Sequence, residues 1–285
     1  MEDHTDRITS PIAAFFDLDK TVISKSSTLA FGLPFYRHGL ISRADALRSV
    51  AAQMLYRTAG AGPGQMERIR AWVCGLCRGW PVDRVNAIVA QYLDELVLPY
   101  VYAEARELMA AHRAAGHDVM IVSTSGHEIV DPIARVIGVD DVIATRMTVA
   151  GGHYTGEIEF YAYGEGKAVR IRELAAERGY RLPDCFAYSD SATDLPLLGT
   201  VGHPRAVNPD RALRQAAMAR GWPVLEFTGT VPAARRARRR GGDPPRPAQG
   251  QVGGMNPPVR DMPPGDLADI TNRSRAGLSK LADSS

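Results

Sequence analysis

Three short apolar runs, each followed at once by polar side chains, constrain the fold of this chain more than any other feature. They cover residues 12–16, 119–122 and 185–188 of the 285. A run that is apolar at every position is typical of a strand buried on both faces, as in a parallel sheet. Segments with helical spacing separate the later runs. This alternation predicts an α/β fold with a doubly wound parallel-sheet core.

The stretch between the first two runs contains no further convincing strand, and we expect it to be helical. Ser42 and Asp45 resemble a capping box that opens the first helix. The helices are expected over residues 42–57, 65–78 and 82–96. We therefore predict an all-helical cap, residues 24–99, inserted into a core made of residues 12–23 and 100–228.

The chain beyond residue 99 alternates between helices and strands, which places most of the core there. Helices are expected over residues 101–115, 128–137 and 167–178. Residues 147–160 alternate around Gly151-Gly152, the pattern of a β-hairpin with a tight turn. Short strands at residues 206–207 and 224–227 complete the predicted fold.

Polar side chains gather where the three predicted buried strands end. The residues after the strands are Asp17, Asp19, Thr21, Ser123, Asp190 and Asp194. Lys167 begins the helix that precedes the third strand. Ligands of such sheets bind at the carboxyl ends of the strands. We therefore expect these side chains to meet at one edge of the sheet.

This combination of residue types suits phosphoryl transfer. Magnesium is bound through oxygen, usually by one or two carboxylates together with the substrate phosphate. A cation is needed because an aspartate nucleophile and a phosphate dianion repel each other. One aspartate can be the covalent nucleophile. A second aspartate, two residues on, can protonate the leaving alkoxide and later deprotonate water.

The order of these motifs resembles the haloacid dehalogenase superfamily of phosphatases. The motifs are D-x-D-x-T after the first strand, a serine after the second, a helix-opening lysine, and D-x-x-x-D after the third. The helical insertion between the first two motifs is similar to that of the phosphoserine-phosphatase-type branch. The resemblance extends over most of the chain, from residue 12 to residue 227.

The resemblance implies the catalytic roles of five residues. Asp17 would be the nucleophile, and Asp19 would be the general acid and base. Thr21 and Ser123 would hold the phosphoryl group. Lys167 would offset the charge between Asp17 and the phosphate. The expected intermediate is an aspartyl-phosphate.

The resemblance also implies a magnesium cofactor. Asp17 and Asp190 would ligate the ion through their carboxylates. The backbone carbonyl of Asp19 would also touch the ion, and Asp194 would orient the shell around it. These four residues form the predicted metal site.

The sequence departs from the phosphoserine-phosphatase pattern at three places. Ser26 stands where a glutamate usually reads the amine of the substrate, and Lys20 stands where a serine is frequent. The second motif is Ser123-Thr124-Ser125 in place of Ser-Gly-Gly. We therefore expect a small phosphorylated metabolite as substrate, such as an amino-acid, sugar-alcohol or lipid-headgroup phosphate. Phosphoserine itself is disfavoured.

The expected activity is magnesium-dependent hydrolysis of a phosphomonoester. Two alternatives remain open. One is a phosphotransferase of the same fold, which passes the phosphate to an alcohol. The other is a non-catalytic module that binds a phosphorylated ligand, although the intact Asp17, Asp19, Lys167 and Asp190 argue against it. The oligomeric state is left open.

The two ends of the chain differ from the rest in composition. We expect disorder over residues 1–11 and 229–285, because both segments are polar and lack periodicity. The C-terminal segment holds ten Lys and Arg against five Asp and Glu, including five arginines within residues 235–240. This charge predicts weak contact with a membrane surface. Nucleic acid is not an expected partner, because no aromatic side chains are interleaved with the arginines.

Cellular location and redox chemistry are also addressed by the sequence. No stretch approaches the roughly 20 continuous apolar residues that a membrane span needs. The N-terminus lacks the pattern of a secretory signal, so a cytoplasmic location is expected. Cys74 and Cys77 form a lone C-x-x-C in a segment with helical spacing. We expect them to be ordinary buried thiols and not a zinc or redox site.

Overall fold

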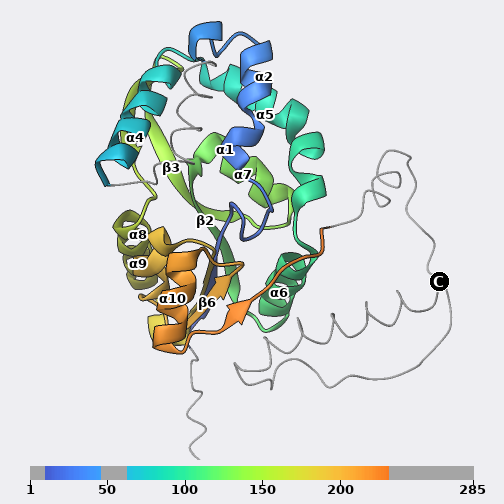
Figure 1. The fold of residues 1–285 in the computed structure, drawn as a ribbon, viewed down its shortest axis with the longest axis vertical. Helices are drawn as coiled ribbons and strands as arrows, with labels where there is room; N and C mark the ends of the chain where they lie inside the picture. The colour runs from blue at the N-terminus through green and yellow to red at the C-terminus, as the bar shows by residue number, and fades with distance from the viewer. Residues whose placement is uncertain (1–9, 46–62, 231–285) are drawn as a thin grey trace, which may run out of the picture.

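A single sheet of seven strands organises the part of the chain that the structure describes. The computed structural model describes residues 10–45 and 63–230. The strand order is β4-β3-β2-β1-β5-β6-β7 (Figure 1). The strands are β1 (Ala13–Asp17), β2 (Asp118–Gly126), β3 (Asp141–Ala150), β4 (His153–Phe160), β5 (Phe186–Ser189), β6 (His203–Val207) and β7 (Val224–Leu225). Every neighbouring pair is parallel except β3 and β4.

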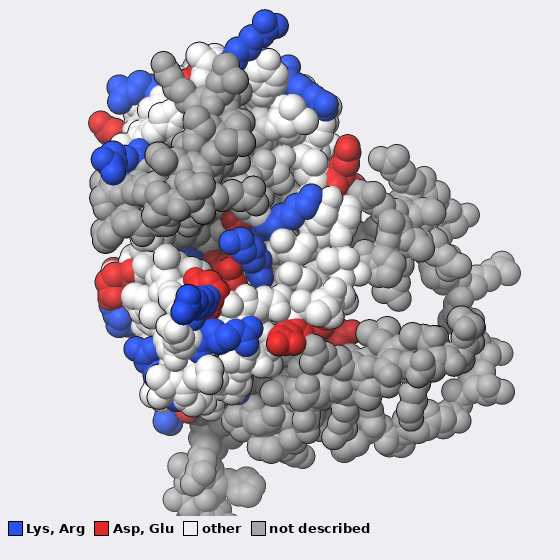
Figure 2. All heavy atoms as spheres, in the orientation of Figure 1, with Lys and Arg blue, Asp and Glu red and all other residues white. Residues whose placement is uncertain are grey.

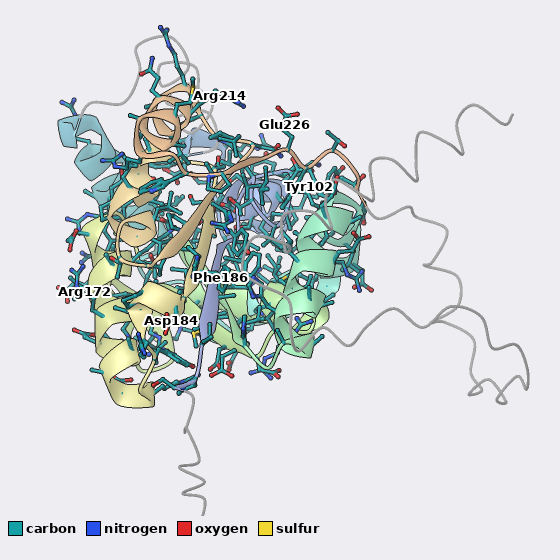
Figure 3. All side chains as sticks on the ribbon, turned by 90° about the horizontal axis from the view of Figure 1, so that it is seen from below. Tyr102, Arg172, Asp184, Phe186, Arg214 and Glu226 are labelled. Atoms are coloured by element: carbon teal, nitrogen blue, oxygen red, sulfur yellow. The ribbon has the colours of Figure 1, made fainter. Side chains whose placement is uncertain are left out.

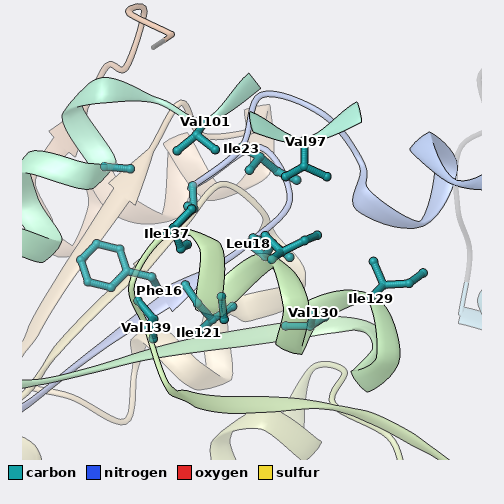
Figure 4. Packing of buried hydrophobic residues seen from close by; sticks show 14 of the residues in the cluster. Phe16, Leu18, Ile23, Val97, Val101, Ile121, Ile129, Val130, Ile137 and Val139 are labelled. Atoms are coloured by element: carbon teal, nitrogen blue, oxygen red, sulfur yellow. The ribbon is translucent and has the colours of Figure 1, made fainter. Parts of the chain in front are cut away.

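The helices lie on both faces of the sheet, so the predicted doubly wound core is confirmed. The side chains of β1 alternate between two apolar clusters: Phe16 joins one and Phe15 joins the other. The first cluster is completed by α6 (Ala103–Ala114) and α7 (His127–Val136). The second is completed by α8 (Glu165–Arg178), α9 (Leu195–Leu198) and α10 (Arg211–Arg220). Figure 4 shows Phe16 and Leu18 packed with Ile121 and Val130. This two-sided burial explains why the first run is apolar at every position.

The cap is built of helices in its described part. They are α1 (Ser27–Ala30), α2 (Gly32–Arg37), α4 (Pro63–Cys77), α5 (Val82–Leu96) and the 3-10 helix η1 (Leu98–Tyr100). Ser42 Oγ accepts the N–H of Asp45 at 3.2 Å, as in a capping box. The predicted helix beyond Asp45 falls outside the described residues. The buried face of α5 belongs to the same apolar cluster as Phe16, so cap and core share one interior.

Two segments of the chain connect the core to the cap, and they lie side by side. Ile23 pairs with Val101 in an antiparallel bridge. The N–H of Ser24 donates to the carbonyl of Tyr100 at 2.8 Å, and the N–H of Tyr102 donates to that of Val22 at 2.9 Å. The crossings therefore lie next to the boundaries predicted at residues 23/24 and 99/100. The division into domains itself stays a prediction.

The β3–β4 hairpin also holds the cap. The N–H of Tyr154 donates to the carbonyl of Trp80 at 3.1 Å, and the carbonyl of Tyr154 accepts the N–H of Gly79 at 2.8 Å. The N–H of Val82 donates to the carbonyl of Gly152 at 3.0 Å. The turn before α5 thus pairs with the tip of the hairpin, and the cap is attached to the core at a third point.

Two predicted strands are longer in the structure. β2 continues through Ser123 to Gly126, so Ser123 lies within the strand and does not follow it. β3 begins at Asp141 and runs parallel to β2 before it turns into the hairpin. The predicted turn at Gly151-Gly152 is confirmed, with φ angles of 55° and 76° that favour glycine. The polar residues Ser123-Thr124-Ser125 and the acidic start of β3 mask these extensions in the sequence.

The C-terminal boundary of the folded part differs slightly from the prediction. We placed residues 229–230 in the tail, but Gly229 accepts the N–H of Ala103 at 2.7 Å and Thr230 pairs with Tyr102. Glu104 Oε1 also accepts the N–H groups of Thr228 and Gly229, both at 2.8 Å. Figure 3 shows Tyr102 close to the segment that carries Glu226. A glutamate at the start of α6 thus fixes the end of the fold.

Most residues of the two chain ends lie outside the part of the chain that the structure describes. Residues 1–9 and 231–285, where we expected disorder and a membrane-surface contact, lie outside the described part of the chain. Among the residues that are described, no helix has the length and apolar character needed to cross a membrane.

Candidate active site

Three strands bring polar side chains to one edge of the sheet. Asp17 is the last residue of β1 and is paired with Val122, so Ser123 lies one step further along β2. Phe16 is paired with Tyr188 on β5, which puts Ser189 level with Asp17. Figure 2 shows acidic side chains between the upper and lower parts of the molecule, with basic side chains close by. The predicted meeting of strand ends is therefore present.

Lys167 joins two of the predicted aspartates. Its Nζ donates to Asp17 Oδ1 at 2.7 Å and to Asp194 Oδ2 at 2.8 Å. Ser189 Oγ donates to the same oxygen of Asp194 at 2.7 Å. Lys167 and Asp194 are each 2% exposed, and Asp17 is 6% exposed. This is a buried ion triad in which one ammonium offsets two carboxylates.

The triad carries less positive than negative charge when both carboxylates are ionised. Burial lowers the pKa of Lys167, but Asp17 and Asp194 raise it by more, so the ammonium stays charged. Burial raises the pKa of Asp17 well above its usual value; Lys167 opposes this, and Asp194 and Asp190 add to it. Burial also raises the pKa of Asp190, to about 6. A further cation at this edge would stabilise the ionised carboxylates.

A tight loop before α8 delivers Lys167 to the strand ends. Gly164 has a φ of 53°, and a Cβ on Gly166 would lie 2.3 Å from the carbonyl oxygen of Tyr161. The N–H of Gly166 donates to the carbonyl of Tyr163 at 2.9 Å. Only glycine allows the backbone to approach so closely at position 166. Lys167 follows directly, in the first turn of the helix.

The carboxylate of Asp19 is held by residues of the cap and of β2. A turn follows β1, in which Lys20 takes a φ of 62°. Asp19 Oδ1 accepts the N–H of Ser27 at 2.9 Å. Its Oδ2 accepts the hydroxyl of Ser125 at 3.2 Å and lies 3.5 Å from the hydroxyl of Ser26. Burial raises the pKa of Asp19, and the bonds from Ser27 and Ser125 oppose that shift.

The two hydroxyls predicted to bind phosphate are both buried. Thr21 is 0% exposed, and its Oγ1 has no hydrogen-bond partner within the described part of the chain. Ser123 is 1% exposed, and its Oγ accepts the N–H of Ser125 at 3.2 Å. A buried hydroxyl without a partner costs roughly 1–3 kcal/mol. Thr21 is therefore suited to donate to a bound ligand.

The four predicted metal residues have different surroundings in the structure, and their role as a metal site stays a prediction. Among the described residues, no group of three or more His, Cys, Asp or Glu side chains is placed to hold a metal ion. The carboxylate of Asp194 is taken up by Lys167 and Ser189, and that of Asp19 by the cap. Asp17 and Asp190 remain, both nearly buried. Magnesium usually takes one or two carboxylates together with substrate phosphate, so these oxygen donors fit that ion.

Comparison with known proteins agrees with this arrangement. Residues 14–199 match the family described as haloacid dehalogenase-like hydrolase. The chain belongs to that family. All seven predicted site residues lie within the matched range.

Several relatives of this hydrolase cover most of its length. The "Inhibition of morphological differentiation protein" of Streptomyces azureus is 56% identical over 270 residues, 94% of this chain and 95% of the relative. A "Probable phosphatase" of Mycobacterium tuberculosis is 56% identical over 219 residues, 77% of this chain and 76% of the relative. A histidinol-phosphatase of Neisseria meningitidis is 31% identical over 219 residues, 75% of this chain and 98% of the relative.

Solved structures share the fold of the hydrolase. A Bordetella pertussis protein of unknown function has a TM-score of 0.68 and 31% identity, covering 76% of this chain and 99% of the other. A phosphoserine phosphatase with a phospho-aspartyl intermediate analogue has a TM-score of 0.55 and 17% identity, covering 81% of this chain and 99% of the other. The second likeness places the hydrolase in the fold of the phosphoserine phosphatases.

Several residues that contact the site were not predicted from the sequence. Ser189 holds Asp194, while Ser27 and Ser125 hold Asp19. Ser189 and Ser125 belong to the polar stretches at strand ends, so their positions in the sequence already indicated that they could lie at the site. Ser27 has no such signal, because its contact depends on how the cap packs on the core.

Other side chains near the site can be described as well. Arg70 of α4 is half-buried and lies 5.3 Å above the ring of Tyr161, in the loop before Lys167. Cys74 and Cys77 are half-buried, and burial raises the pKa of Cys77 to about 12. A protonated thiol of this kind is unreactive, as expected for an ordinary thiol.

Proposed function

We propose that this hydrolase is a magnesium-dependent phosphatase that forms a phosphoryl-enzyme on Asp17. The observation that carries the proposal is the buried Asp17 at the end of β1, bonded to the ammonium of Lys167. An attacking carboxylate has to approach a phosphate dianion, and a fixed cation between them offsets the repulsion. The naming of a 56% identical relative as a probable phosphatase supports the same reaction class.

The proposed reaction has two steps. In the first, an oxygen of Asp17 attacks phosphorus and the bond to the leaving oxygen breaks. That oxygen keeps the electron pair and takes a proton from Asp19, so an alcohol leaves. In the second, water attacks phosphorus and gives a proton to Asp19. The bond to Asp17 breaks, and inorganic phosphate is released.

The other predicted residues hold the phosphoryl group. The unpartnered hydroxyl of Thr21 and the buried Ser123 can donate to its oxygens. Lys167 keeps its charge next to the forming bond. Asp17 and Asp190 would hold magnesium, which supplies charge neutralisation and aligns the phosphate when bound. Asp194 orients Lys167 through their 2.8 Å contact.

The proposed substrate is a small phosphorylated metabolite. The cap shares an interior with the core, so it lies where it can select the part of the substrate beyond the phosphate. Ser26 beside Asp19 is a short, neutral side chain. It cannot form the ion pair that a glutamate makes with an amine. A substrate other than phosphoserine follows from that difference.

The experiment is hydrolysis of 4-nitrophenyl phosphate by the wild type and by Asp17→Asn. We expect magnesium-dependent turnover in the wild type, none with a chelator, and a loss of at least about 10³-fold in the variant. Asp131→Asn, which removes only a surface pair with Arg135, is the matched control. Full activity of Asp17→Asn would show that the nucleophile is misassigned.

The same assay separates the alternatives. A phosphotransferase would form a new phosphate ester when an alcohol is added, in place of releasing all phosphate to water. A binding module would show no turnover with any of a panel of phosphorylated metabolites, yet one of them would raise its melting temperature.

A further inference from the structure

A cluster of hydroxyls holds the carboxylate of Asp19 at the place where the cap meets the core. Ser125 belongs to β2 of the core, and its Oγ donates to Asp19 Oδ2 at 3.2 Å. Ser27 belongs to α1 of the cap, and its N–H donates to Asp19 Oδ1 at 2.9 Å. Asp19 Oδ1 is therefore held from the cap and Oδ2 from the core, with Ser26 Oγ on the cap side 3.5 Å from Oδ2 as well.

The hydroxyl of Ser125 is surrounded by polar groups. Ser27 Oγ and Thr28 Oγ1 each lie 2.9 Å from Ser125 Oγ. A serine hydroxyl has one proton to donate and two lone pairs to accept with. When Ser27 and Thr28 donate to the lone pairs, the single proton of Ser125 is left for Asp19. An ionised Asp19 only accepts, and Ser26 Oγ, 3.5 Å from Oδ2, is a longer second donor to that oxygen.

Two members of the cluster, Ser27 and Ser125, are shielded from competing water, whereas Thr28 lies at its exposed side. Ser27 is 0% exposed and Ser125 is 7% exposed. A hydrogen bond in such surroundings is electrostatically stronger than one in water, and an orientation fixed by several partners is well defined. Proton transfer requires the acid within hydrogen-bond reach of the leaving oxygen. A misplacement of about 1 Å can cost roughly 10²-fold in rate.

We propose that Ser125 is a positioning residue for the carboxylate of Asp19, and that Thr28 of the cap acts on Asp19 through Ser125. The proposal rests on the function proposed above, in which Asp19 protonates the leaving oxygen. Ser125 does not touch the reacting atoms. It fixes the rotation of the Asp19 side chain, so the proton is presented in one direction once the cap helix α1 is in place.

The test compares two aryl phosphates that differ by one nitro group. The phenolate of phenyl phosphate is the poorer leaving group and needs protonation, whereas 4-nitrophenolate leaves without it. The quantity is kcat/KM, which includes substrate binding and formation of the phosphoryl-enzyme. We expect Ser125→Ala to lower kcat/KM about 10-fold or more for phenyl phosphate, and less than about 3-fold for 4-nitrophenyl phosphate.

Conservative and matched variants separate positioning from damage to the fold. Ser125→Thr keeps the hydroxyl and is expected to restore the ratio between the two substrates. Thr124→Val removes a neighbouring hydroxyl that donates to the carbonyl of Ala162 at 2.9 Å, and it is expected to leave the ratio unchanged. In an Asp19→Asn background, Ser125→Ala is expected to have no further effect on the ratio.

A double-mutant cycle tests the contribution of the cap. Thr28 is exposed, so Thr28→Val should fold normally. We expect it to shift the ratio in the same direction as Ser125→Ala, by about 2- to 5-fold, and to add nothing once Ser125 is alanine. Additive effects would overturn the role of Thr28.

If the ratio of kcat/KM between the two substrates is unchanged in Ser125→Ala, whether both values fall equally or neither falls, the role of Ser125 is overturned. These outcomes leave the proposed function standing if the wild type turns over and Asp17→Asn does not. A wild type without magnesium-dependent turnover of either substrate would overturn both proposals.

Discussion

Lys167 is the residue on which we expect the stability of the site to depend, and the proposed chemistry uses the same ammonium group. Its ammonium is almost completely buried and is bonded to the carboxylates of Asp17 and Asp194. Removing one partner of such a group leaves uncompensated buried charge, which typically costs about 3–5 kcal/mol. The same charge would face the phosphate during transfer.

We expect Lys167→Met to lower the free energy of unfolding by about 3 kcal/mol at pH 8. The loss should be smaller at pH 5. The pKa of Asp17 is already raised, and without the ammonium its carboxyl takes up a proton more readily as the pH falls. Urea denaturation at the two pH values measures this difference. Lys25→Met, at an exposed lysine over the ring of Tyr100, is the control. An equal loss at both pH values would contradict the explanation.

A buried histidine makes stability depend on pH in another way. His112 is 0% exposed, and its Nε2 lies 2.8 Å from the hydroxyl of Tyr188. Its Nδ1 lies 2.9 Å from Nδ1 of His117. Burial lowers the pKa of His112 to about 3, and His117 and Arg205 add to the shift. The folded protein therefore keeps this ring neutral over a range in which an unfolded histidine binds a proton.

The sign of this effect follows from proton binding. Between about pH 6.5 and pH 3 the unfolded chain holds one more proton at His112, so the free energy of unfolding falls by up to about 1.4 kcal/mol per pH unit as the pH is lowered. We expect His112→Gln to reduce this slope by about one proton, measured by denaturation across that range. His153→Gln, at an exposed ring, is the comparison. An unchanged slope in His112→Gln would show that another group titrates.

At the scale of elements, the loop before α8 determines where the lysine stands. A Cβ at Gly166 would overlap the carbonyl of Tyr161, so Gly166→Ala must displace the loop and Lys167 with it. We expect a loss of activity of about 10²-fold. Gly75→Ala in α4 has open space around the new Cβ. It should keep full activity and gain about 0.5–1 kcal/mol in stability. Equal activity in the two variants would contradict this account.

The β3–β4 hairpin limits how the cap can move. Backbone hydrogen bonds join its tip to the turn at residues 79–82, in addition to the two chain crossings. A Cβ on Gly156 would lie 2.9 Å from Arg78 Nε and 3.2 Å from the carbonyl oxygen of Cys74, at a φ of +84°. We expect Gly156→Ala to loosen this contact. Faster amide hydrogen exchange in α4, with unchanged exchange in α10, would be the measurement.

At the scale of the whole molecule, a bound ion would stabilise the fold as well as the reaction. A ligand that binds only the folded state at 100 times its Kd adds about 2.7 kcal/mol. We expect saturating magnesium to raise the melting temperature by several degrees, and Asp190→Asn to abolish most of the rise. Sodium chloride of equal ionic strength is the salt control. A rise of the same size in Asp190→Asn would exclude Asp190 as a ligand.

The sequence by itself determined the sheet and the polar edge. Buried parallel strands need apolar residues on both faces, and this local requirement is visible in residues 12–16 without any tertiary information. The carboxyl ends of parallel strands meet at one edge, so Asp17, Ser123 and Lys167 could be brought together by reasoning alone. The family follows from the same motifs.

Only the tertiary structure decided which side chains pair within that edge. The bonds of Asp19 to Ser27 and Ser125 join residues 8 and 106 positions apart. The bonds between the hairpin and the cap join residues 70 to 75 positions apart. Such contacts depend on how two apolar surfaces pack together. Helical periodicity in the sequence shows which face of a helix is buried, but it does not show which element covers that face. That is why the pairing of Asp194 with Lys167, and the bonds of Asp19 to α1 and to β2, could not be predicted from the sequence, while Asp17 and Asp190 stay the proposed carboxylate ligands of the metal.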